Sequence, residues 1–229
     1  QFYRDAHCEA FFATQQAYYQ AVNQEYERKG VKLTKTWFDQ FFGLKTTENY
    51  YAIVGISSRE GAYLRVDYKN NYRDTYTIFG CSAFDSKGVP STFADLTFSR
   101  TMLHEYVHAY TNQLIDNNMA ALQSAAEVII ANPRVYDLMK DTFYGNWQFV
   151  LYESMVRAGG IKYMMANEKD TAVAEREMVK QEKAGFFWIR GLVKELDRYE
   201  SNRSTYANLE SYMPELIKYF ESVAREMKK

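Results

Sequence analysis

The stretch Thr101–Tyr110, TMLHEYVHAY, contains two of the three histidines in the 229 residues and stands where the character of the sequence changes. Short segments rich in β-branched and aromatic residues precede it, and long segments with helical periodicity follow it. Apolar residues at helical spacing predict a buried stripe on one helix, made of Leu103, Val107, Tyr110 and Leu114. We therefore expect this helix to open a helical part, about residues 98–229, after a strand-containing part, about residues 1–97.

Three segments of the first part are predicted to be strands because they are short, rich in β-branched and aromatic residues, and separated by Gly, Asn and Asp. They are NYYAIVGIS (49–57), GAYLRVDYK (61–69) and DTYTIFGCSAF (74–84). We expect them to form a small, mostly antiparallel sheet. The segment 74–80 is the nearest clear strand before the histidine helix, so it is the candidate for an edge that pairs with an extended ligand. An interior strand without such a role is the alternative.

Helices are predicted wherever apolar residues recur at helical spacing between Gly, Pro and Asn punctuation. The expected ranges are about 3–28, 34–43, 99–117, 119–131, 134–142, 147–167, 171–199 and 208–227. The pair Gly159-Gly160 leaves open a kink or an end within 147–167. A strand-containing first part followed by helices predicts an α+β fold, and the length suits a single domain spanning residues 1–229.

Composition excludes several classes of protein. A net charge of −1 gives no support to a nucleic-acid partner, and no run of residues reaches the roughly 18 apolar residues of a transmembrane helix. Two cysteines, Cys8 and Cys81, permit at most one disulfide, and two separate buried thiols are the simpler expectation. The chain starts at Gln1 rather than Met, which either a cleaved export signal or a shortened start would explain.

The two histidines of the opening stretch are spaced for a metal ion. Residues four apart on a helix project from the same face, so His104 and His108 can offer two imidazoles to one ion. Glu105 points about 100° away and is suited to act as the general base that takes a proton from water, as in His-Glu-x-x-His zinc enzymes. The alternative is a partly exposed histidine pair on an ordinary amphipathic helix. His7 is remote and is expected to be structural or on the surface.

A catalytic zinc usually has three protein ligands, so a third donor is required. No histidine follows His108 closely, and two downstream carboxylates compete for the role. Glu127 has the shorter spacing. Glu153 lies among apolar residues and has Arg157 one turn later, which can orient a ligand through a hydrogen bond. These features favour Glu153, with Glu127 as the alternative metal ligand.

Two stretches of the sequence are similar to a known family: LHEYVHAY, which contains the histidine motif, and the later YGNWQFVLYESMVRAGGIKYM. Together they resemble a family of bacterial extracytoplasmic proteins classed as a domain of unknown function and predicted to be glutamate-type zincins. Trp147, Glu153 and the segment 156–158 (Val-Arg-Ala) match that family, whereas Tyr152 stands where the family often has Asn. The resemblance implies a zincin-like fold, export from the cytoplasm, zinc at His104, His108 and Glu153, and a catalytic Glu105.

The expected function is therefore zinc-dependent hydrolysis, with a peptide or protein as substrate and Zn²⁺ as cofactor. Two alternatives stay open: a non-catalytic exported binding or scaffold domain, and a zinc hydrolase of a non-peptide amide. Glu105 favours an enzyme over a scaffold, because binding a metal does not by itself require that carboxylate.

Overall fold

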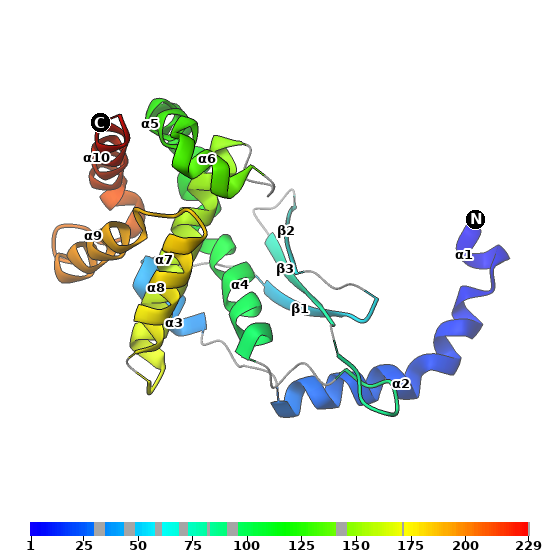
Figure 1. The fold of residues 1–229 in the computed structure, drawn as a ribbon. Helices are drawn as coiled ribbons and strands as arrows, with labels where there is room; N and C mark the ends of the chain where they lie inside the picture. Colours follow the sequence, from blue (N-terminus) through cyan, green and yellow to red (C-terminus); the bar gives the residue numbers. More distant parts are fainter. Residues whose placement is uncertain are drawn as a thin grey trace. The chain divides into compact units, whose positions relative to one another are not determined.

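The computed structural model describes residues 1–29, 35–43, 49–57, 61–68, 73–81, 83–90, 96–140, 146–170 and 172–228. The chain divides into two compact units, residues 1–33 with 48–105 and residues 34–47 with 106–229. The division falls inside one continuous helix, α4 (Leu96–Asn117), which carries the histidine motif (Figure 1). Helices dominate and one small sheet lies in the first half, so the predicted α+β class is confirmed.

The sheet in the first unit is mixed rather than mostly antiparallel. Its strands are β1 (Asn49–Gly55), β2 (Ala62–Asp67) and β3 (Arg73–Gly80), in the order β1-β3-β2. β2 pairs antiparallel with β3, as expected, but β1 pairs parallel with it. Residues 74–80, the candidate edge, are instead the interior strand that was kept as the alternative: β3 is central and pairs on both sides. It is also the most buried strand, since Thr75, Thr77 and Phe79 are all buried.

The helix predicted for residues 3–28 is interrupted near its start. Its two parts are α1 (Phe2–Asp5) and α2 (Cys8–Lys29), and His7 between them adopts a φ of 48°. A residue in this left-handed region breaks the helical hydrogen-bond pattern, and no Gly or Pro marks the place in the sequence. The later part of α2 packs into a small core with the sheet and α4, made of Val22, Phe79, Cys81 and Met102.

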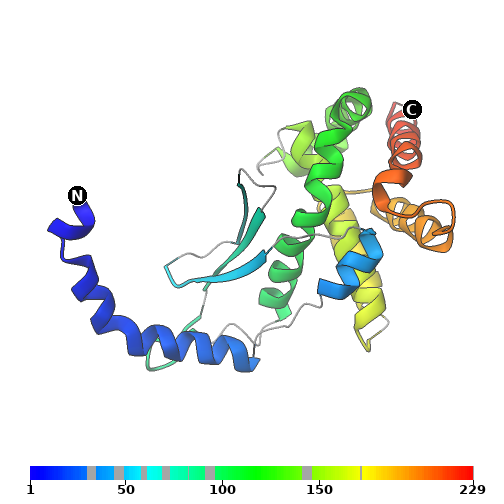
Figure 2. The same cartoon turned by 180° about the vertical axis from the view of Figure 1, so that it is seen from behind.

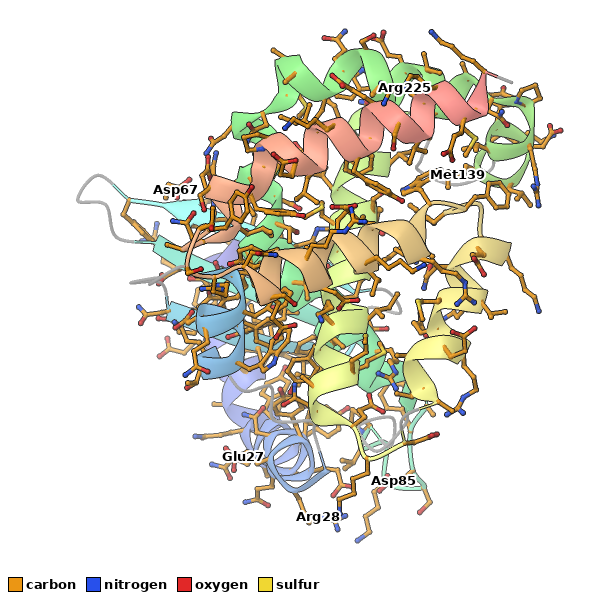
Figure 3. The ribbon with its side chains drawn as sticks, turned by 90° about the vertical axis from the view of Figure 1, so that its left-hand side faces the viewer. Glu27, Arg28, Asp67, Asp85, Met139 and Arg225 are labelled. Carbon is orange, nitrogen blue, oxygen red and sulfur yellow. The ribbon has the colours of Figure 1, made fainter. Side chains whose placement is uncertain are left out.

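The second unit consists of helices. They are α3 (Lys35–Phe42), α5 (Met119–Ala131), α6 (Pro133–Met139), α7 (Trp147–Asn167), α8 (Val173–Lys183), α9 (Ile189–Ser201) and α10 (Leu209–Met227), together with α4 from Tyr106 onward. α10 lies beside α5, and α9 lies beside α7 (Figures 1 and 2). Arg225 is on the exposed side of α10 (Figure 3).

The predicted helix 171–199 is two helices, α8 and α9. Gly185 adopts a φ of +100°, and the backbone N–H of Phe186 donates to the carbonyl of Gln181 at 3.0 Å. This is the usual way in which a glycine ends a helix, since the left-handed conformation costs glycine little. The glycine packs against buried Met139 (labelled in Figure 3), whose Cε would lie 3.0 Å from a Cβ at residue 185.

Helix α7 begins and ends where the sequence predicts. The Asn146 side chain accepts a hydrogen bond from the backbone N–H of Gln148 and caps the helix. The helix continues through Gly159-Gly160 without a break. A Cβ at residue 159 would lie 2.9 Å from Cγ1 of Val107 and 3.2 Å from Cζ of Phe42. Gly159 therefore serves close packing of α7 against α4 and α3 rather than a kink.

Two smaller expectations are settled by the described part of the chain. Cys8 and Cys81 are both free thiols, as expected, and Cys81 is buried; the expectation that Cys8 is also buried was wrong, because this residue is partly exposed. None of the helices described is long and apolar enough to cross a membrane.

Candidate metal centre

The helix that carries the motif is oriented as its apolar stripe predicts. Leu103, Val107, Tyr110 and Leu114 are all buried. His104 and His108 lie on the flank of this stripe, one turn apart on the same continuous helix. The His108 side chain is only 12% exposed, so its imidazole faces the protein interior. His104 is likewise partly buried, so both histidines lie between the core and the exposed surface of the helix.

Glu153 on α7 comes close to this pair. Its Oε1 lies 3.5 Å from Nε2 of His108, and single donor atoms of His104, His108 and Glu153 all lie within 4.8 Å of one another. Two ligands of a tetrahedral zinc, each about 2.0–2.2 Å from the ion, are themselves roughly 3.4 Å apart. Two imidazoles and a carboxylate are also a donor set that catalytic zinc sites use. The donor set therefore fits zinc in its chemistry, and the separation of His108 from Glu153 matches that of two zinc ligands.

Asn112 fixes which nitrogen of His108 faces the other donors. Nδ1 of His108 lies 2.9 Å from Oδ1 of Asn112, one helical turn later. A carbonyl oxygen only accepts, so this contact suits the neutral tautomer with the proton on Nδ1, in which Nε2 has the lone pair that a metal needs. The sequence interpretation missed Asn112. Its position four residues after His108 on one helix was the available signal.

Arg157 is placed to hold the second oxygen of Glu153. Its Nη2 donates to Oε2 of Glu153 at 2.9 Å, one turn along α7. The guanidinium also lies 4.6 Å from the centre of the Phe186 ring, and its Nη1 donates to Gln181. Oε2 of Glu153 is thereby engaged, which turns Oε1 toward His108. Arg157 thus contacts the carboxylate that it was expected to orient, and its role in supporting a metal ligand stays a prediction.

Tyr152, the residue before Glu153, ties α7 to the motif helix. Its hydroxyl donates to the Asp116 carboxylate near the end of α4. Burial, followed by this hydrogen bond, raises the pKa of Tyr152 above its usual value, so the hydroxyl stays protonated as a donor. Together with the close packing at Gly159, this contact aligns α7 along α4. It gives a structural reason for a tyrosine at residue 152.

Glu105 follows His104 and lies outside the donor group, as a general base would. Its Oε1 would be 3.2 Å from a Cβ at residue 61, and Thr101 Cγ2 would be only 2.8 Å from that Cβ. Gly61 directly precedes β2, so the lack of a side chain allows the start of this strand to approach Glu105. A larger residue would press on the carboxylate and on Thr101.

Glu127, the alternative metal ligand, and His7 both lie outside the donor group. Glu127 is exposed on α5 and accepts a hydrogen bond from Nε2 of Gln123 at 2.8 Å. Among the residues that the structure describes, the donor group contains Glu153 and not Glu127. His7 is exposed, in keeping with a surface role. That Glu153 ligates zinc stays a prediction, which this geometry supports.

Comparison with known proteins identifies the family of the chain and gives no similar curated protein or solved structure. A search of curated proteins and a search of solved structures each gave no match to the chain. The sequence profile of a family described as a domain of unknown function, DUF4932, matches residues 1–219. Because this match spans nearly the whole sequence, the chain belongs to the DUF4932 family.

Proposed function

We propose that the chain is a zinc-dependent hydrolase, a glutamate-type metallopeptidase that acts on peptide bonds outside the cytoplasm. One observation carries the proposal: the donor atoms of His104, His108 and Glu153 converge, and Glu105 follows the first of them on the same helix. A structural metal site would need the donors but not the adjacent carboxylate.

Each residue has a distinct role in this proposal. When bound at the three donors, zinc would polarise the scissile carbonyl and acidify a water molecule. Glu105 takes the proton of the attacking water and delivers it to the leaving amine. Asn112 holds the His108 ring in the tautomer that exposes Nε2, and Arg157 orients Glu153.

The sheet suggests where an extended substrate would lie. Peptides bind open sheet edges as an additional strand, through backbone hydrogen bonds. β3 is central, so within the described sheet the outer edges belong to β1 and β2. β2 begins at Ala62, next to Gly61 and hence near Glu105. We therefore propose the outer edge of β2 as the substrate edge, in place of residues 74–80.

The test is hydrolysis by the zinc-loaded protein. A set of unstructured peptides and a set of non-peptide amides are incubated with the protein, and the products are identified by mass spectrometry. We expect cleavage of peptide bonds that stops when a chelator removes the metal and returns when zinc is added back. The variant His104→Ala/His108→Ala is the control for contaminating peptidases.

Three other outcomes of this hydrolysis test would reject all or part of the proposed function. Cleavage confined to the amides would keep the zinc chemistry and reject the peptidase assignment. Zinc binding without cleavage of either set would favour the binding or scaffold alternative. Cleavage that survives in the double histidine variant would mean that the activity does not come from this site.

A further inference from the structure

The strongest unassigned feature is a chain of polar side chains that runs from Glu153 into α8. Arg157 Nη2 donates to Glu153, and Arg157 Nη1 donates to Oε1 of Gln181 at 2.5 Å. Nε2 of Gln181 in turn donates to Oε1 of Glu177, one turn earlier on α8. The chain therefore links a candidate metal ligand to a helix that contributes no donor to the metal group.

Gln181 is an unusual residue for its location. It is 3% exposed and lies in the last turns of α8, where a buried polar side chain must be hydrogen-bonded to be tolerated. Its amide has one orientation that satisfies both neighbours, because Arg157 can only donate and the Glu177 carboxylate can only accept. Gln181 is therefore held in a single amide orientation, in which its oxygen accepts from Arg157 and its nitrogen donates to Glu177.

The end of α8 fixes the Arg157 guanidinium from two directions. Gln181 accepts from Nη1, and the Phe186 ring, which is fully buried, lies 4.6 Å from the guanidinium carbon. The backbone N–H of Phe186 donates to the carbonyl of Gln181, so the turn after α8 holds the amide and the ring in one arrangement. Arg157 is flexible by itself, and these contacts restrict the rotamers from which it can reach Glu153.

We propose that Gln181, held by Glu177, is a positioning residue for the metal site and acts through Arg157 on the Glu153 carboxylate. The inference rests on the proposed function, because it assumes that Glu153 binds zinc. Gln181 touches neither the donors nor the reacting atoms. Its effect is to keep Oε1 of Glu153 turned toward His108 before the metal arrives, which lowers the reorganisation that binding requires.

The experiment measures zinc affinity by competition with a calibrated chelator. Gln181→Leu keeps a similar side-chain volume and removes the acceptor, and we expect affinity to fall by about 10- to 100-fold, the usual effect of losing support behind a ligand. The exchanged pair Gln181→Glu/Glu177→Gln keeps the net charge and both hydrogen bonds: residue 181 still accepts from Arg157, and the bond between residues 177 and 181 reverses its direction. We expect it to restore most of the lost affinity.

Two further measurements separate positioning from folding. Val173→Ala removes buried apolar volume from the same helix without touching the polar chain, and serves as the packing control. Urea unfolding of each metal-free variant reports stability. The visible spectrum of the Co²⁺-loaded protein reports the geometry around the metal, and we expect it to change in Gln181→Leu and to return in the exchanged pair.

The outcomes distinguish this inference from the proposed function. Wild type that binds zinc while Gln181→Leu loses no more affinity than Val173→Ala would overturn the positioning role alone. A loss that the exchanged pair does not recover would also overturn it, because general disruption of α8 would then explain the effect. Wild type that binds no zinc would overturn both proposals together.

Discussion

Replacing Glu105 with Gln is expected to lower kcat for any substrate of the wild type by about 10²–10⁴-fold, the usual contribution of a general base. Gln keeps the size of the side chain and a hydrogen-bonding oxygen, but it cannot take the proton of water at neutral pH. Zinc should remain bound, because Glu105 lies outside the donor group of His104, His108 and Glu153. The measurement is steady-state kinetics alongside the zinc content of the same preparation.

A matched substitution elsewhere controls for the loss of one negative charge in Glu105→Gln. Glu127→Gln makes the same chemical change on an exposed face of α5 and should leave kcat unchanged. Turnover by Glu105→Gln at a rate comparable with wild type would exclude Glu105 as the base. Loss of zinc together with activity would show instead that the carboxylate belongs to the metal site.

The second large effect is expected on zinc affinity when Glu153 is changed. Glu153→Ala leaves two imidazoles, and affinity should fall by more than the roughly 10- to 100-fold that supporting residues cost. Glu153→Gln should be milder, since an amide oxygen is a poorer zinc donor than a carboxylate. Arg157→Ala should fall between wild type and Glu153→Ala, because it loosens a ligand without removing it. Chelator competition ranks the four proteins.

Glu127→Ala is the matched control for this series, because the residue is exposed and contacts Gln123 rather than the histidines. We expect its zinc affinity to equal that of wild type. Loss of the metal in Glu127→Ala but not in Glu153→Ala would mean that the described arrangement of α7 is not the one that binds zinc. If neither change mattered, the glutamate-type assignment would fail.

Local signals predicted the elements that carry the site. The apolar stripe of α4 follows from spacing along one helix, and α7 is predicted from its Asn146 cap and its long apolar pattern. The choice of Glu153 over Glu127 also had a local basis, since Arg157 lies one turn later on the same helix. Such features depend on neighbours in sequence, which is why they can be recognised without a structure.

The features that sequence reasoning missed depend on contacts between distant residues or on a backbone angle. The parallel pairing of β1 with β3 joins strands that are not consecutive. His7 breaks the first helix through a positive φ that no Gly or Pro announces, and Gly185 ends α8 although an isolated glycine is often tolerated in a helix. Gln181 lies 24 residues from Arg157, so nothing local connects them.

The central claim is that His104 and His108, with Glu153, hold one zinc ion. Elemental analysis after zinc loading and removal of free metal tests it most directly, with wild type and His104→Ala/His108→Ala treated in parallel. We predict one zinc per chain in wild type and none above background in the double variant, with both proteins folded by circular dichroism. Equal zinc content in the two proteins, whether high or absent, would contradict the claim.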